Sequence, residues 1–236
     1  MILPYELERQ IPSSLGLIVL QADETIEAEF RQLFAGQAIA IYHSRIPSAP
    51  EVTPETLARM EAAIPQSVSL FPPVEFSVIG YACTSGATII GPENVAKAVR
   101  SVRPDTKVTD PLTAAIAWCR AQNARRIGFL TPYRAEVSTQ MREALVDAGL
   151  EIASFGSFAE ENEHKVARIS ERSILEAVVA VNTDNCDAIF VSCTNLRALH
   201  VVEQATFDLG KPVASSNTVL AWHMRKLANL EAGNEP

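Results

Sequence analysis

The feature that most constrains the fold is a pair of matching turns, each formed by a short apolar run that leads into Cys-Thr. The first run covers 78–82 and is followed by Cys83; the second covers 188–191 and is followed, after one serine, by Cys193. Runs of β-branched and aromatic residues of this length indicate buried strands. Each cysteine is therefore expected where a strand ends and a helix begins, which is where open α/β sheets bind ligands.

The spacing of the two turns indicates two related halves. The residue numbers of Cys83 and Cys193 differ by 110, and those of the strand-like runs that begin at Gly16 and Gly128 differ by 112. A near-constant offset is typical of an internal repeat. If the halves pack about a pseudo-twofold axis, the two thiols face each other across one cleft.

Strands and helices alternate along both halves, which predicts an α/β fold with a mostly parallel sheet in each. We expect an N-terminal lobe over 1–112, whose last helix is able to cross over, and a C-terminal lobe over 113–236. The expected strands cover 16–20, 38–42, 78–82, 106–109, 126–130, 152–155, 188–191 and 212–214.

Four local expectations concern the surroundings of the turns. The run 46–54 is expected to be a loop over the cleft, and Thr53 the N-cap of the helix that follows it. The run 157–164 is expected to be a polar loop. A helix is expected over 196–207, directly after the second turn.

Composition excludes several classes of protein. With a net charge of −8 and no clustered Lys or Arg, binding to nucleic acid through a basic surface is not expected. No apolar stretch is long enough for a membrane helix, and the N-terminus lacks the pattern of a secretory signal. Four cysteines without such a signal indicate reduced thiols and a cytoplasmic protein. The scattered histidines and the absence of Cys-x-x-Cys give no support for a metal site.

The two turn cysteines are the candidate catalytic residues. Cys119 and Cys186, in a helical run and in a loop, are interpreted as structural. A Cys-His hydrolase needs an imidazole, and the nearest one, His200, falls on a predicted helix. Two thiols facing one carbon suit another task, in which Cys83 or Cys193 acts as base or nucleophile while the other supplies a proton on the far side.

Polar side chains near the predicted strand ends form a candidate binding site. Helix capping alone explains many such residues, and a tyrosine among them is also explained as a core aromatic. A capping turn whose N–H and O–H groups point into a cleft is nevertheless also a carboxylate site. The candidates are Gln21, Thr84, Ser85, Tyr133, Thr194, Asn195 and Ser216.

Phosphate-binding glycine motifs are missing, since residues 80–86 match neither a Walker loop nor Gly-x-Gly-x-x-Gly. We therefore expect an enzyme that needs no cofactor and acts on a small carboxylate.

At these residues the chain resembles the aspartate/glutamate racemase superfamily, and within it the group of maleate cis-trans isomerases and arylmalonate decarboxylases. The run from Gly16 to Thr25 is most similar to the branch associated with ectoine utilisation. The motifs that carry the resemblance to the group are 82–86, Thr131-Pro132-Tyr133, 192–197, and Pro212-Val213 leading to 215–217 and 220–223.

The resemblance implies two pseudo-symmetric Rossmann-like lobes with the active site in the cleft between them. It further implies that Cys83 is the nucleophile that adds to a double bond and that Cys193 is the acid/base. Decarboxylases of the group have glycine at the first position, so the presence of Cys83 favours an isomerase or racemase. The resemblance also assigns carboxylate binding to Thr84, Ser85 and Tyr133, and a substrate amide to Asn195.

The chain departs from the group at Gln21, where maleate isomerases have an asparagine, and the longer amide is expected to reshape the site. The group also tends to form dimers or tetramers, so a homo-oligomer is expected. Two alternatives stay open: an amino-acid racemase that transfers a proton between two bases, as in ectoine degradation, and a non-catalytic protein that binds carboxylates.

Overall fold

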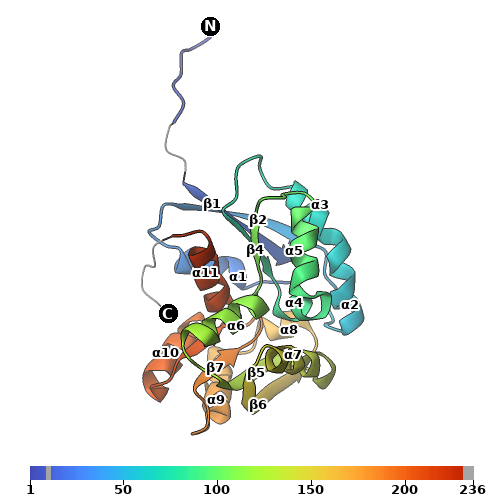
Figure 1. Ribbon diagram of the computed structural model, residues 1–236, viewed down its shortest axis with the longest axis vertical. Coiled ribbons are helices and arrows are strands. Elements are labelled where there is room, and N and C mark those ends of the chain that lie inside the picture. The colour runs from blue at the N-terminus through green and yellow to red at the C-terminus, as the bar shows by residue number, and fades with distance from the viewer. Residues whose placement is uncertain (9–11, 231–236) are drawn as a thin grey trace.

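Two four-stranded parallel sheets form the centre of the protein (Figure 1), whose structure is a computed structural model that describes residues 1–8 and 12–230. The first sheet has the order β2-β1-β3-β4 and the second the order β6-β5-β7-β8. Both halves therefore share one topology, which confirms the predicted α/β fold with a repeated parallel sheet. The strands are β1 (Ser13–Leu20), β2 (Ile39–Ile46), β3 (Val78–Ala82), β4 (Lys107–Thr109), β5 (Arg126–Tyr133), β6 (Glu151–Glu160), β7 (Ala188–Val191) and β8 (Val213–Ser215).

Helices cover both faces of each sheet, so the central strands are buried on both sides and need continuous apolar sequence (Figure 1). In the first half the helices are α1 (Ile26–Leu33), α2 (Pro54–Ala58), the 3-10 helix η1 (Arg59–Ala63), α3 (Ile64–Ser69), α4 (Thr84–Ile90) and α5 (Pro92–Arg100). In the second half they are α6 (Pro111–Ala121), α7 (Ala135–Asp147), α8 (Glu163–Val166), α9 (Glu171–Val181), α10 (Leu199–Leu209) and α11 (Ser216–Leu227).

The last helix, α11, packs on the sheet of the first half. Leu220 and Met224 belong to one buried cluster with Leu15 and Leu17 of β1. A Cβ at Gly80 of β3 would lie 2.8 Å from the Met224 sulfur, so any larger residue there has to displace the methionine side chain. A helix from the C-terminal end of the chain thus packs on the sheet of the first half. The predicted domain boundary after residue 112 stays a prediction.

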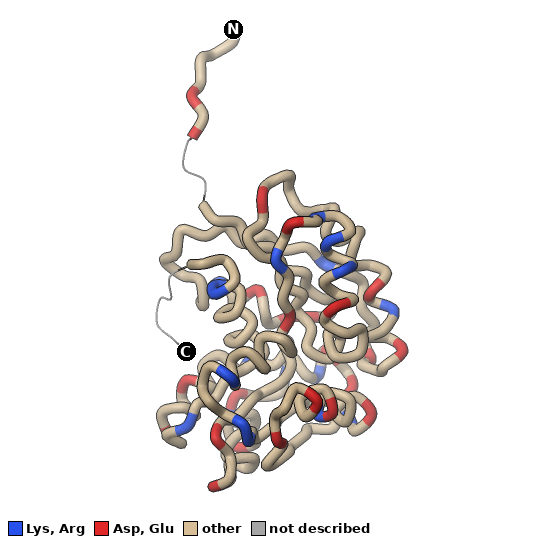
Figure 2. The backbone as a smooth tube through the Cα atoms, viewed as in Figure 1, with Lys and Arg blue, Asp and Glu red and all other residues tan. Residues whose placement is uncertain are grey.

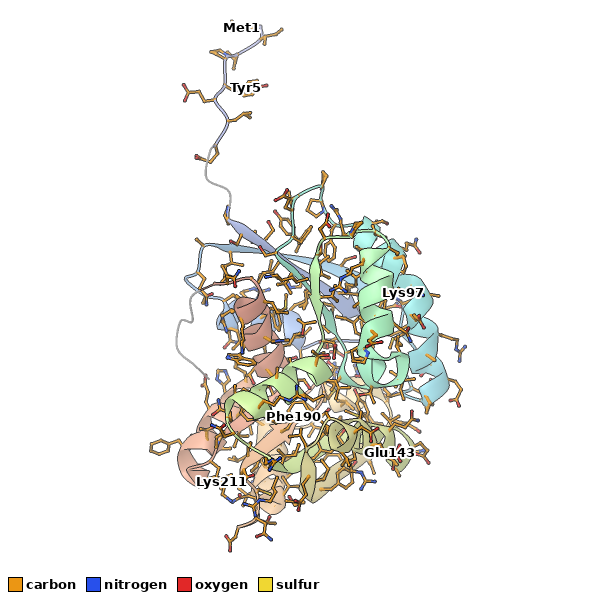
Figure 3. The ribbon with its side chains drawn as sticks, viewed as in Figure 1. Met1, Tyr5, Lys97, Glu143, Phe190 and Lys211 are labelled. Carbon is orange, nitrogen blue, oxygen red and sulfur yellow. The ribbon has the colours of Figure 1, made fainter. Side chains whose placement is uncertain are left out.

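The core of the second half is formed by aromatic stacking on β5 and β7. Phe129 and Phe190 are fully buried, with their ring centroids 6.1 Å apart, and Phe190 lies inside the lower lobe in Figure 3. The first eight residues extend away from the lobes, as the labelled Met1 and Tyr5 show. Acidic and basic residues are spread over both lobes in Figure 2. Within the described residues, no helix is long and apolar enough to cross a membrane.

Two local predictions are wrong and one is confirmed. The predicted polar loop over 157–164 is instead the end of β6 followed by α8, because Asn162 accepts a hydrogen bond from the Lys165 N–H and caps a new helical turn. Helix α10 begins at Leu199, three residues later than predicted. Thr53 is the N-cap of α2, with the predicted proline at the first helical position.

Candidate functional site

Cys83 lies at the junction of β3 and α4, as the sequence predicts. It is the N-cap residue of α4, with extended backbone, and its Sγ accepts a hydrogen bond from the Gly86 N–H at 3.1 Å. The Ser85 hydroxyl lies 3.5 Å from the same sulfur. Donors of this kind stabilise a thiolate more than a thiol, so the turn is arranged for a reactive cysteine.

A buried tyrosine lies beside this thiol, and the sequence analysis missed it. A Cβ placed on Gly86 would lie 2.9 Å from the Cys83 sulfur and 2.6 Å from the Tyr81 hydroxyl, so glycine is needed here. Tyr81 is fully buried, and its hydroxyl has no hydrogen-bond partner among the described residues. The signal was present, since residues two apart on a strand share a face.

Cys193 follows β7 in a different backbone conformation. Its φ is 122°, a region that favours glycine, and no helix follows directly. The Cys193 sulfur lies 3.0 Å from the Tyr133 hydroxyl and accepts a hydrogen bond from the Asn195 N–H at 3.3 Å. The predicted helix start next to this cysteine is therefore wrong, and the sulfur is contacted by a tyrosine hydroxyl as well as by a backbone N–H.

Hydrogen bonds join the two cysteine turns across the lobes. The Cys193 N–H donates to the Ser216 hydroxyl at 2.9 Å, and that hydroxyl lies 2.7 Å from the Thr84 hydroxyl. The Thr194 hydroxyl donates to the carbonyl of Ala82 at 3.3 Å. The structure thus places Cys83, Thr84, Cys193, Thr194 and Ser216 in one buried cluster.

Glu163, the first residue of α8, completes this cluster and was not a predicted site residue. Its carboxylate accepts hydrogen bonds from the Tyr133 hydroxyl at 2.9 Å and from the Asn195 amide at 2.8 Å. The Asn195 amide oxygen accepts from the Glu24 N–H at 2.8 Å. Sequence analysis placed Glu163 in a loop, where a glutamate is expected to be exposed, and no local pattern marks it as buried.

At the end of β1 the residue turned inward is Asp23 and not Gln21. Gln21 is exposed, because the chain turns away from the sheet after Leu20. Asp23 is 4% exposed, and its Oδ1 accepts the N–H groups of Thr25 and Ile26 at the start of α1. The structure therefore brings the other predicted site residues together but not Gln21.

Burial dominates the electrostatics of the site. Desolvation raises the pKa of Cys83 to about 12 and the pKa of Cys193 well above its ordinary value, with the charge of Glu163 adding to both shifts. Desolvation also raises the pKa of Glu163 to about 7, against the hydrogen bonds from Asn195 and Tyr133. In this structure both cysteines are thus neutral thiols near pH 7.

The segment between β2 and α2, predicted to cover the cleft, is bound to the second lobe. The Val52 N–H donates to the carbonyl of Glu161 at 3.0 Å, and the Glu163 N–H donates to the carbonyl of Pro50 at 3.0 Å. On the same side, the Arg168 guanidinium pairs with Glu24 at 2.9 Å. These contacts between the lobes enclose the site.

The remaining candidates agree with their structural interpretation. Cys119 is fully buried in α6, and Cys186 packs beside the hydroxyls of Thr183 and Ser154. His200 is exposed on α10. In the part of the chain that the structure describes, no group of three or more His, Cys, Asp or Glu side chains is placed to hold a metal ion.

Comparison with known proteins identifies what this arrangement resembles. The sequence model of the family described as "Arylmalonate decarboxylase" matches residues 15–235. A maleate isomerase of Nocardia farcinica is 25% identical over 226 residues, which cover 92% of this chain and 90% of that protein. The match over nearly the whole chain confirms the group that the sequence motifs indicate.

Two solved structures have the same fold. A mutant of Nocardia farcinica maleate cis-trans isomerase with a covalently bound succinylcysteine intermediate superposes with a TM-score of 0.84 at 23% identity, covering 92% of this chain and 93% of that one. A mutant arylmalonate decarboxylase in a liganded form superposes with a TM-score of 0.85 at 21% identity, covering 95% and 96% of the two chains.

Proposed function

This chain belongs to the arylmalonate decarboxylase family, and from that premise we propose that it is a cofactor-independent isomerase that uses Cys83 and Cys193 on a small carboxylate. Cys83 is the nucleophile and Cys193 the acid/base. The observation that carries the proposal is the chain of hydrogen bonds Cys193–Ser216–Thr84, which holds two buried cysteine turns from different lobes side by side.

In the cis-trans route the Cys83 thiol first releases its proton to water, and the resulting thiolate adds to a carbon of an activated double bond. A carbon–sulfur bond forms, and the π electron pair moves to the neighbouring carbon, which takes a proton from the Cys193 thiol. Rotation about the resulting single bond follows, after which Cys193 removes that proton and the carbon–sulfur bond breaks. The Gly86 N–H and the Ser85 hydroxyl, which contact the Cys83 sulfur, favour the thiolate that this route needs.

In the racemase route one thiolate removes the proton from Cα and the other cysteine, as a thiol, returns a proton on the opposite face. The buried carboxyls of Asp23 and Glu163 favour this second candidate, because they suit an amino group better than a second carboxylate. Both routes use the same two sulfur atoms, so they differ in substrate and not in machinery.

Substrate binding is assigned to the polar groups around the sulfur atoms. The hydroxyls of Thr84, Ser85 and Tyr133 hold the carboxylate, and Thr194, Asn195 and Ser216 stay proposed substrate-binding residues. Thr194 and Ser216 also join the two turns through Ala82 and Thr84. The homo-oligomer, the cytoplasmic location and the link to ectoine utilisation stay predictions from the sequence.

Intact-protein mass spectrometry tests the proposal. The enzyme is incubated with maleate, substituted maleates and amino-dicarboxylates, with Cys83→Ala as control, and parallel samples are kept in heavy water. A stoichiometric adduct on Cys83 that is lost in the control supports the cis-trans route. Deuterium at Cα of an amino acid without an adduct supports the racemase route. Turnover that survives replacement of both cysteines contradicts the proposal, and ligand binding without either reaction supports a non-catalytic carboxylate-binding protein.

A further inference from the structure

Two buried carboxyl groups lie beside the paired cysteines. Asp23 and Glu163 are each 4% exposed. The side chain of Asn195 links the neighbours of Asp23 to Glu163. Its amide oxygen accepts a hydrogen bond from the Glu24 N–H. Its amide nitrogen lies 3.4 Å from the Ala22 carbonyl and donates to the Glu163 carboxylate at 2.8 Å. The two acids therefore belong to one site, although they come from different lobes.

One oxygen of Asp23 has no partner. Its Oδ1 accepts two N–H groups at the start of α1, whereas Oδ2 is buried and forms no hydrogen bond within residues 1–8 and 12–230. The Thr194 hydroxyl is near enough to lower the pKa of Asp23, but it donates to the Ala82 carbonyl at 3.3 Å. Helix capping does not need this second oxygen, since serine, threonine or asparagine caps as well. A buried carboxylate oxygen without a donor is costly, so its presence indicates a donor supplied from outside the chain.

A second capping aspartate provides the contrast. Asp110 caps α6 in the same way, with Oδ1 accepting the N–H groups of Leu112 and Thr113, and its Oδ2 accepts the Thr113 hydroxyl at 2.6 Å. Both aspartates are almost fully buried. The unpartnered oxygen is thus a property of Asp23 and not of buried caps in this fold.

Among the residues that the structure describes, no basic side chain forms an ion pair with either carboxyl group. Glu163 accepts only from the neutral groups of Tyr133 and Asn195. Arg45 lies near Asp23, but its guanidinium donates to the backbone carbonyl and pairs with Glu27. Burial raises the pKa of Asp23 and raises that of Glu163 to about 7, so a cation that binds beside them stabilises both carboxylates. A dianion such as maleate offers no such stabilisation and is repelled by either acid once that acid is ionised.

A small pocket borders Glu163. Its lining includes Leu20 at the end of β1, Ala49, Val52 and Met60. The Met60 methyl group also approaches Gly86, the residue whose N–H contacts the Cys83 sulfur. The pocket therefore lies between Glu163 and the Cys83 turn, and its other walls are apolar except at Ser48, Glu51 and Thr56.

We infer that Asp23 and Glu163 bind an ammonium group of the substrate, so that the substrate is a small zwitterionic amino acid and not a dicarboxylate dianion. The ammonium donates to the free Asp23 Oδ2 and to the Glu163 carboxylate, and it neutralises charge that otherwise opposes a thiolate at either cysteine. A substrate without this group leaves the two acids unpaired. The inference rests on the proposed two-cysteine site and assigns its ligand class.

Isothermal titration calorimetry on the full chain at pH 7.5 tests the inference with two matched pairs of probes. Aspartate is compared with succinate, and 4-aminobutyrate with butyrate, because the members of each pair differ in one ammonium group. We expect the ammonium member to bind at least about tenfold more tightly. Asp23→Asn and Glu163→Gln keep the hydrogen-bonding shape and remove one charge, so each reduces this preference about fivefold or more.

Asp110→Asn is the matched control, because it removes a buried capping charge outside the site and leaves the preference unchanged. Circular dichroism verifies that each variant is folded. The comparison of the probes on the wild-type protein tests the inference without any variant. The inference is overturned if succinate and butyrate bind as tightly as their partners, if both ammonium probes fail to bind, or if folded Asp23→Asn and Glu163→Gln proteins keep the wild-type preference.

The cysteine chemistry is measured separately on the same preparations. A maleate adduct on Cys83 without any ammonium preference contradicts the inference and leaves the proposed function intact. If the ammonium probes bind more tightly but neither an adduct nor deuterium exchange is detected, the inferred ligand class is supported and the proposed two-cysteine reaction is contradicted.

Discussion

The two cysteine turns have the same place in the fold and different chemical surroundings. Each follows the third strand of a four-stranded sheet with the same strand order. A backbone N–H contacts each sulfur, and around Cys83 the chain begins a helix at once. Around Cys193 the backbone has a φ of 122° and a tyrosine hydroxyl contacts the sulfur. The repeated sheet topology therefore places both cysteines at equivalent positions, and the local sequence gives their thiols different surroundings.

The two tyrosines near the sulfur atoms show this difference best. Tyr133 is bonded to Cys193 and to Glu163, so it connects the thiol to a carboxyl group whose pKa burial raises to about 7. Tyr81 lies beside Cys83, and its hydroxyl has no hydrogen-bond partner in the described part of the chain. Hydroxyls lie near both sulfur atoms, but the one at Cys193 also contacts a carboxyl group, whereas the Ser85 hydroxyl lies 3.5 Å from the Cys83 sulfur. This difference fits an acid/base role for Cys193 and a nucleophilic role for Cys83.

The largest expected effect comes from replacing each cysteine by serine. Both variants should lose turnover by about a thousandfold or more, because serine is a poor nucleophile and a poor acid at these positions. Their intermediates should differ: Cys83→Ser forms no adduct, whereas Cys193→Ser keeps one on Cys83. Mass spectrometry beside turnover measures both. Adducts of equal yield in the two variants would show that the turns are chemically equivalent.

Replacing each tyrosine by phenylalanine tests the same contrast with a smaller effect. Tyr133→Phe removes two hydrogen bonds in the site and should lower kcat about tenfold to a hundredfold. Tyr81→Phe removes a hydroxyl that has no partner and should leave kcat near the wild-type value. Steady-state kinetics with thermal unfolding of both variants is the measurement, and a large loss in Tyr81→Phe would contradict this assignment.

The pH dependence of stability follows from the buried acids. Burial raises the pKa of Glu163 and of Glu29 from 4.5 to about 7. Between pH 4.5 and about 7 these acids stay protonated in the folded state but are ionised in the unfolded chain. The free energy of unfolding is therefore highest below pH 4.5 and falls as the pH rises to about 7. Each acid accounts for up to about 3 kcal/mol of this loss. Urea unfolding across the window should show a flatter profile for Glu163→Gln and for Glu29→Gln.

The two glutamates differ in what else they change. Glu29 accepts from the N–H groups of Ala198 and Leu199 and from Asn217, outside the cysteine turns. The charge of Glu163 raises the pKa of Cys193. Alkylation of Cys193 as a function of pH should therefore shift to lower pH in Glu163→Gln only. An equal shift in Glu29→Gln would show a general effect of buried charge.

The smallest expected effect is a packing change at the first turn. In Gly86→Ala the new methyl group meets the Tyr81 hydroxyl at 2.6 Å and the Cys83 sulfur at 2.9 Å, which should cost about 1–3 kcal/mol of stability. Adding Tyr81→Phe removes the nearer of the two atoms and should recover part of that loss. Chemical denaturation of the single and double variants measures it, and additive effects would argue against the contact.

The sequence predicted the two turns because their signals are local. A short apolar run followed by Cys-Thr is visible without any contact information, and Tyr133, which ends β5, follows the same logic. Glu163 and Asp23 gave no such signal. Both are acidic residues in polar stretches, where exposure is the ordinary expectation, and only the approach of α8 to the end of β1 buries them.

By itself, the sequence determined the α/β class, the repeated parallel sheet and the two strand-end cysteines, because strands and helices follow from periodicity over a few neighbouring residues. The tertiary structure alone decided which polar groups share the site. The pairing of Thr84 with Ser216, the burial of Asp23 and the contact of Glu163 with Tyr133 all join residues that are distant in the chain. Such contacts depend on how two lobes pack, and no local pattern encodes that.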